Sequence, residues 1–357
     1  MLGLGRAYYK GELLSGQEAL DRAGIEKIQL AAKRRACLDQ WYDVLTGIGA
    51  LATYDGIQLL KLSDMPGCCL SMEVHNGITS PFEEDLHTIR PQSGQLATAR
   101  NIRNLLEGSK NTTVATQQRV QDPYTLRCIP QIHGASKDSI AYVKTKVEIE
   151  INSVTDNPII TKEGHVISGG NFHGEPMAQP FDFLGIALSE IGNVSERRVE
   201  RLVNSQLSKL PSFLVKHPGL NSGFMITQYA CASLASENKI LSHPASVDSI
   251  PSCENQEDFV SMGTTAARKA AEILKNSRRI VATEIMAACQ ALDLKPENHE
   301  LGKGTKPAYD LFRQHVRFIE FDKDIEIYEE LNKASELIES DEFLAAVENA
   351  VDLSIQF

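Results

Sequence analysis

The longest helical pattern in the sequence, residues 257–292, constrains the fold more than any other feature. It runs far past the eleven or twelve residues of an average globular helix, and alanines recur in it where neighbouring helices would press closely. Two further long patterns of helical period span residues 181–203 and 225–241. No run of useful length alternates polar and apolar residues as a strand does. The sequence therefore predicts an all-α protein, an elongated bundle of long helices.

Shorter elements are predicted around this bundle. Ser15, followed three residues later by Glu18, is typical of a helix N-terminus. The motif Asp64-Met65-Pro66-Gly67 is predicted to end a helix that begins near residue 34. The other predicted elements are a hairpin around residues 10–12, helices within 80–90, 93–106 and 140–151, two small strands about 163–164, and two helices after 306.

Length, charge and cysteine content exclude several classes of protein. A chain of 357 residues buries a core of its own, as one large domain or two. A net charge of -11 argues against a nucleic-acid partner, and no apolar run is long enough to span a membrane. The N-terminal residues lack the pattern of a signal peptide, which predicts a cytoplasmic location. The seven cysteines lack metal-ligand spacing, so we expect reduced thiols and no metal site.

One stretch, residues 119–134 (RVQDPYTLRCIPQIHG), crowds uncommon polar groups between two helical segments. Gln121, Tyr124 and Arg127 recur every three residues, so one turn of backbone would present an amide, a phenol and a guanidinium together. A guanidinium binds a carboxylate through two charge-assisted hydrogen bonds, and a phenol can relay a proton. The pattern predicts a pocket for a small carboxylate. The alternative is that Arg127 pairs with a structural acid and Tyr124 only packs.

Four other polar clusters fall at predicted helix ends or loops, where functional groups are usually displayed. Gly169 and Gly170 would let the backbone approach a ligand closely. Glu257, at a predicted helix start, would be stabilised as an anion and would suit an ammonium group. His173 is interpreted as a core or loop histidine rather than a ligand. The four clusters are residues 155–158, 169–173, 243–248 and 254–258.

Several ordered motifs resemble one known family, the aromatic amino acid ammonia-lyases, and most closely bacterial histidine ammonia-lyases. They include RVQDPYTLRCIPQIHG, TDNPII, ISGGNFHGEP and NQEDFVSMGTTAARK, and the resemblance covers residues 1–33 and 81–295. It implies a fumarase/aspartase-like helical architecture and homotetramers whose active sites are lined by several subunits. It also implies elimination of ammonia from a small aromatic amino acid: L-histidine to give urocanate or, alternatively, tyrosine or phenylalanine.

The resemblance assigns roles residue by residue and divides the chain into three parts. Residues 1–80 would be a diverged N-terminal helical segment, 81–300 the lyase core with its active-site loops, and 301–357 the C-terminal helices. Tyr124 and Glu257 would be catalytic. The residues expected to bind or orient the substrate are Arg127, Gln121, Asn157, Phe172, Asn255 and Gln256. Phe259 replaces a histidine common in the bacterial enzymes.

The family uses an electrophile, 4-methylideneimidazole-5-one, that forms from an Ala-Ser-Gly triad. This chain has five Ala-Ser pairs and none is followed by glycine, so the electrophile is expected from a partner or a missing N-terminal segment. The first hypothesis is therefore a C-terminal part or subunit of a split or truncated enzyme, a homo-oligomer or a hetero-oligomer with an N-terminal lyase chain, inactive alone. The second hypothesis is a non-catalytic scaffold or regulatory pseudo-subunit.

Overall fold

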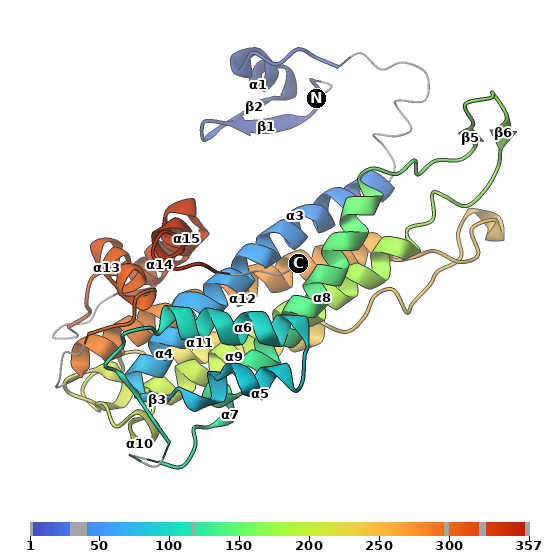
Figure 1. Ribbon diagram of the computed structural model, residues 1–357. Coiled ribbons are helices and arrows are strands. Elements are labelled where there is room, and N and C mark those ends of the chain that lie inside the picture. The colour runs from blue at the N-terminus through green and yellow to red at the C-terminus, as the bar shows by residue number, and fades with distance from the viewer. Residues whose placement is uncertain are drawn as a thin grey trace.

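The computed structural model describes residues 3–28, 41–115, 117, 119–295, 300–320 and 326–353. Five long helices lie along one another in an elongated bundle (Figure 1). They are α3 (Trp41–Leu62), α8 (Ile129–Glu150), α9 (Glu175–Val203), α11 (Met225–Leu241) and α12 (Gly263–Leu294). The predicted all-α bundle is confirmed. Among the described residues, no helix is both long and apolar enough to cross a membrane.

The centre of the bundle is the contact between α9 and α12, and α3 and α11 also pack against both helices. Glycines on α9 allow this close approach. A Cβ atom at Gly185 would lie 3.1 Å from Cδ1 of Ile273, and one at Gly192 would lie 2.8 Å from Oγ of Ser277. The middle of α12 is buried on nearly every side, which explains its many alanines.

The helix expected to end at residues 64–67 instead continues through a π-helical segment, η1 (Ser63–Gly67), into α4 (Cys68–Val74). The α-helix thus ends at Leu62, as predicted, but residues 64–67 continue the helical path instead of breaking it, and the predicted start near residue 34 lies outside the described residues. Asp64 in η1 is fully buried, and its carboxylate accepts hydrogen bonds from Lys137 and from Asn101 at 3.2 Å, and pairs with Nδ1 of His133 at 2.9 Å. These polar contacts offset the cost of a π-helical turn inside the core.

A second buried ion pair links α9 to α12. Glu284 accepts two hydrogen bonds from Arg198, at 2.5 Å from Nε and 3.0 Å from Nη2, and both side chains are almost fully buried. The hydroxyls of Ser71 and Ser195 donate to the same carboxylate at 2.8 and 2.6 Å. Each oxygen of Glu284 thus has two donors, which satisfies the charge inside the protein.

Short strands form three two-stranded sheets among the described residues. At the N-terminus, β1 (Arg6–Tyr9) pairs antiparallel with β2 (Glu12–Ser15), and Ser15 caps α1 (Gly16–Ala23) by accepting from the amide of Glu18, as predicted. The predicted strands about residues 163–164 are β5 (Ile159–Ile160) and β6 (Val166–Ile167). The third sheet joins β3 (Gly77–Ile78) to β4 (Thr112–Thr113) in parallel.

The remaining helices cover the bundle. The two predicted between residues 80 and 106 are found, with a short 3-10 turn, η2 (Ser80–Phe82), before them. After residue 304 the structure has three described helices rather than the two expected, because Ser340 starts a separate helix. The elements are α5 (Glu84–Thr88), α6 (Ser93–Leu105), α7 (Tyr124–Arg127), α10 (Ser205–Ser208), α13 (Thr305–His315), α14 (Ile327–Glu339) and α15 (Asp341–Glu348). The division at residues 80 and 300 remains a prediction.

Candidate active site

A pocket of about 900 Å³ opens where two loops meet the start of α12. The first loop precedes α9 and carries Phe172, and the second precedes α12 and carries Glu257. Four of the eight predicted site residues line this pocket: Asn157, Phe172, Gln256 and Glu257. Residues far apart in sequence thus converge, as the resemblance implies for a lyase site.

Asn157 is fixed by its side-chain oxygen. That oxygen accepts a hydrogen bond from the amide of Gly169 at 2.8 Å and another from the hydroxyl of Ser168 at 3.2 Å. The side-chain nitrogen has no hydrogen-bond partner in the part of the chain that the structure describes. An amide held in this way presents its two N–H donors to the pocket, where they suit a carbonyl or carboxylate oxygen.

Aromatic rings form one wall of the pocket. Phe172 is partly exposed in the pocket, and the rings of His173 and Phe259 stack with centroids 6.1 Å apart. The imidazole Nε2 of His173 donates to the carbonyl oxygen of Phe259 at 3.0 Å, and its Nδ1 accepts from the amide of Glu175 at 3.3 Å. His173 therefore joins the two pocket loops, and its interpretation as a satisfied loop histidine agrees with these contacts.

Glu257 does not lie at a helix start, so the expected support from a helix dipole is absent. The helix α12 begins six residues later, at Gly263, and Glu257 lies in the preceding loop. A different contact holds it, because the hydroxyl of Ser252 donates to Oε2 of its carboxylate at 2.6 Å. Between the two residues the backbone makes a tight turn that includes Asn255, which has a φ of 68° and does not line the pocket.

The other three predicted residues lie elsewhere. Arg127 and Tyr124 belong to α7, with the guanidinium carbon 4.7 Å from the centre of the phenol ring. Gln121 precedes the helix and is exposed, so the predicted single turn of three groups is not found. The helix α8 lies between α7 and the segment that carries Asn157, and its 22 residues make it about 33 Å long. In Figure 1, α7 and the β5–β6 segment lie toward opposite ends of α8.

Apart from its contact with the ring of Tyr124, Arg127 has no charged partner among the described residues. Its Nε is buried without a hydrogen-bond partner, and no acid among the described residues forms an ion pair with it. Tyr124, by contrast, is 68% exposed. The interpretation in which Arg127 pairs with a structural acid is therefore not supported, and both side chains remain available to a ligand or another copy of the chain.

Sequence reasoning missed two residues, Arg268 and Ser252. Arg268 lines the pocket from the second turn of α12, and Asp258, a member of the predicted cluster 254–258, lines it beside Glu257. Ser252 bonds to Glu257 from across the turn. Arg268 and Asp258 lie inside the motif NQEDFVSMGTTAARK, so the signal was present, but no spacing rule gives them a role.

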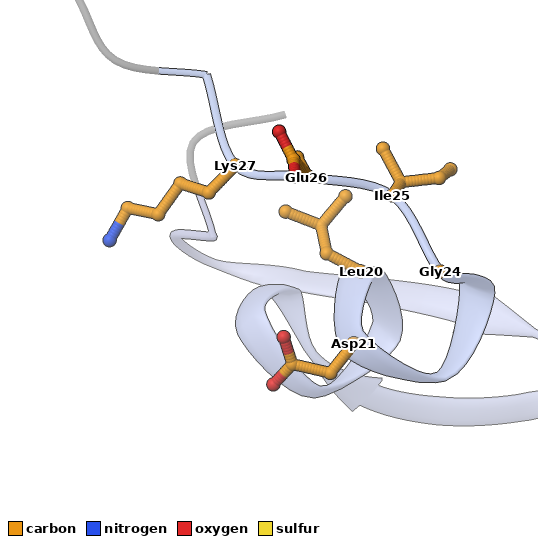
Figure 2. A pocket seen from close by; sticks show the side chains of 6 residues that line it. All are labelled: Leu20, Asp21, Gly24, Ile25, Glu26 and Lys27. Carbon is orange, nitrogen blue, oxygen red and sulfur yellow. The ribbon is translucent and has the colours of Figure 1, made fainter.

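A second hollow, of about 420 Å³, lies at the end of α1 (Figure 2). Only α1 and the residues directly after it line the hollow, and the side chains of Asp21 and Lys27 point in different directions. None of the predicted site residues is near it in sequence. With no converging polar groups, it lacks the features of a specific ligand site.

Comparisons with known proteins agree with the family resemblance seen in the sequence motifs. The sequence model of the family described as aromatic amino acid lyase matches residues 1–314. A histidine ammonia-lyase from Streptococcus gordonii (strain Challis) is 94% identical over 357 residues, which is 100% of this chain and 69% of that protein.

Solved structures are also similar. The histidine ammonia-lyase of Trypanosoma cruzi gives a TM-score of 0.86 at 37% identity and covers 98% of this chain and 67% of that one. A tyrosine aminomutase from Streptomyces globisporus gives a TM-score of 0.90 at 33% identity and covers 99% and 71% of the two chains. These likenesses confirm the architecture predicted from the sequence.

Proposed function

This chain belongs to the aromatic amino acid lyase family, and from that premise we propose that it forms the substrate-binding part of an enzyme that eliminates ammonia from L-histidine to give urocanate. The observation that carries the proposal is the 94% identity to a histidine ammonia-lyase along the whole chain. The tyrosine aminomutase shares the fold at only 33% identity, so the fold alone does not choose the substrate.

The active site is proposed to form between copies of the chain. Arg127 and Tyr124 are available at one end of α8, and the pocket with Glu257 lies toward the other end. One copy cannot bring these groups to one small amino acid, since about 33 Å of helix separates them. An antiparallel neighbour would place α7 of one copy at the pocket of another. This arrangement needs at least a dimer.

Each residue then has a role that follows from its chemistry. Arg127 binds the substrate carboxylate through its guanidinium, and Gln121, from the segment before α7, offers a further hydrogen-bonding group. Tyr124 exchanges a proton during elimination. Glu257 contacts the substrate amine or imidazole as an anion. The groups that orient the substrate in the pocket are Asn157, Phe172, Gln256 and, through the turn, Asn255.

The pocket fits the family's electrophile, although these 357 residues contain no Ala-Ser-Gly triad to make it. Asn157 offers unused N–H donors that suit a ring carbonyl, and Phe172 offers a flat apolar surface. When bound, 4-methylideneimidazole-5-one supplies an electron-poor centre that makes the amino group a better leaving group. We propose that a segment outside these residues, or a separate chain, provides it.

The test compares three preparations: this chain alone, this chain with a polypeptide that carries the Ala-Ser-Gly segment, and that polypeptide alone. We expect only the mixture to convert L-histidine to urocanate, followed by ultraviolet absorbance, and we expect tyrosine and phenylalanine to be poor substrates. Turnover by the chain alone would contradict the need for a second segment. If the mixture binds but gives no turnover with any of the three amino acids, the non-catalytic scaffold is the better description.

A further inference from the structure

In the part of the chain that the structure describes, one side chain holds the carboxylate of Glu257, that of Ser252. The hydroxyl oxygen lies 2.6 Å from Oε2, within the range of a hydrogen bond to an ionised carboxylate. The backbones of the two residues are also paired, because the amide of Ser252 donates to the carbonyl of Glu257 at 2.9 Å and the amide of Glu257 donates back at 3.3 Å. Ser252 and Glu257 therefore form the closed base of a small loop.

The chain that closes this loop has an unusual conformation. Cys253, Glu254 and Asn255 have φ angles of 51°, 53° and 68°, so three consecutive residues other than glycine are left-handed. This region is unfavourable for L-residues, and a run of three persists only where the surroundings determine it. The backbone bonds of Asn255 to Ser252 and of Gln256 to Cys253, both at 3.0 Å, stabilise the turn from within, and the bonds between Ser252 and Glu257 close its base. The turn thereby brings this hydroxyl to this carboxylate.

Two other contacts fix the same loop without touching the carboxylate. The hydroxyl of Ser249 accepts from the amide of Val260 at 2.9 Å, and His173 donates to the carbonyl of Phe259. These two contacts fix the backbone of Phe259 and Val260, which follow Glu257 in the chain. They leave the rotation of its carboxyl group open, because the last torsion of a glutamate side chain has broad, two-fold preferences. Among the described residues, Ser252 alone bonds to the carboxylate and restricts that rotation.

We propose that Ser252 is a positioning residue for the lyase reaction. Its hydroxyl donates a hydrogen bond to Oε2 of Glu257, so that Oε1 is the oxygen presented to the substrate. This inference rests on the proposed function, in which Glu257 contacts the substrate. The physical consequence is pre-organisation, since a carboxylate that already has one oxygen bound loses less freedom when the substrate arrives.

The test uses the complete enzyme, assembled with the segment that supplies the electrophile, and five variants, of which three are single changes at Ser252 and Ser249. Ser252→Ala removes the hydroxyl and is expected to lower kcat/KM about 10- to 100-fold, the range for losing a hydrogen bond to a charged group. Ser252→Thr keeps a hydroxyl and is expected to restore most of the activity. Ser249→Ala is the matched control, because it removes a hydroxyl from the same loop but not from Glu257, and we expect a change within about threefold.

A double-mutant cycle separates positioning from general loosening of the loop. In Glu257→Gln the charge that Ser252 orients is gone, so adding Ser252→Ala should cost little further activity. A loss of the same size in both backgrounds would overturn the proposal. So would equal effects of Ser252→Ala and Ser249→Ala, since a merely structural role predicts that result.

A crystal structure tests the geometry independently of turnover. We expect the Glu257 side chain to occupy one rotamer in the wild type and in Ser249→Ala, and several in Ser252→Ala. An unchanged Glu257 carboxylate in Ser252→Ala refutes the inference even if histidine is turned over. If the wild type has no activity with histidine but this structural difference is seen, the proposed substrate is wrong while the role of Ser252 in holding Glu257 stands.

Discussion

Replacing Glu284 by glutamine should destabilise the bundle more than replacing Asp64 by asparagine. The carboxylate accepts four hydrogen bonds, from Nε and Nη2 of Arg198 and from the hydroxyls of Ser71 and Ser195, and it is fully buried. Glutamine keeps one acceptor oxygen, which serves only one of the two hydroxyls, and it leaves the buried guanidinium without a counter-charge. Removing one partner of a buried pair costs about 3–5 kcal/mol, so we expect a loss of that size.

The matched variant is Arg198→Met combined with Glu284→Gln. Methionine fills most of the volume of the arginine stem, and no unpaired charge remains, so the double variant should be less destabilised than the sum of the two single variants by at least about 3 kcal/mol. The assay is urea unfolding at one fixed protein concentration, because an oligomer's midpoint depends on concentration. Additivity within about 0.5 kcal/mol would refute the coupling between Arg198 and Glu284.

Two further predictions follow from the core. Burial acts to raise the pKa of Asp64, but Lys137 and His133 together lower it to about 2; the stability this provides is present above the unfolded value near 3.9 and is lost as the pH falls toward 2. The lowered pKa of Asp64 contributes about 2.5 kcal/mol to the free energy of unfolding. In urea titrations the wild type should therefore lose more stability between pH 5 and pH 2 than Asp64→Asn does. Equal losses would contradict a lowered pKa for Asp64. In α3, a Cβ added at Gly49 would overlap the ring of Phe181, whereas Gly47 faces open space. Gly49→Ala should therefore cost about 1–3 kcal/mol and Gly47→Ala should be neutral or stabilising in the same assay, and a reversed order would show that the α3–α9 contact is misplaced.

The sequence by itself determined the helices whose apolar faces are long and continuous. The predicted helix over residues 225–241 agrees with α11 at both ends, and the pattern over 181–203 lies within α9. Periodicity works there because a helix with one buried face must repeat its apolar residues every three or four positions. The ordered motifs also identified the family, while the catalytic and substrate-binding roles of individual residues remain predictions.

Tertiary structure alone decided the boundaries and contacts that depend on distant partners. Residues 64–67 were interpreted as a break, yet the helical path continues there through a π turn. The buried Asp64 in that turn is paired with Lys137 and hydrogen-bonded to His133, both from α8. The start of α12 moved from residue 257 to Gly263, because the backbone of Glu257 pairs with Ser252 instead of entering the helix. Neither outcome is visible in a local pattern.

The site shows the same division. From the sequence, Gln121, Tyr124 and Arg127 were grouped because they are close in the chain, and the residue types pointed to a carboxylate pocket. Their distance from the pocket of Asn157, Phe172, Gln256 and Glu257 is set by the length of α8, which the spacing of motifs does not reveal. Sequence determines which groups a chain can offer to a substrate, whereas the packing of long, rigid helices decides which of them one chain can bring together.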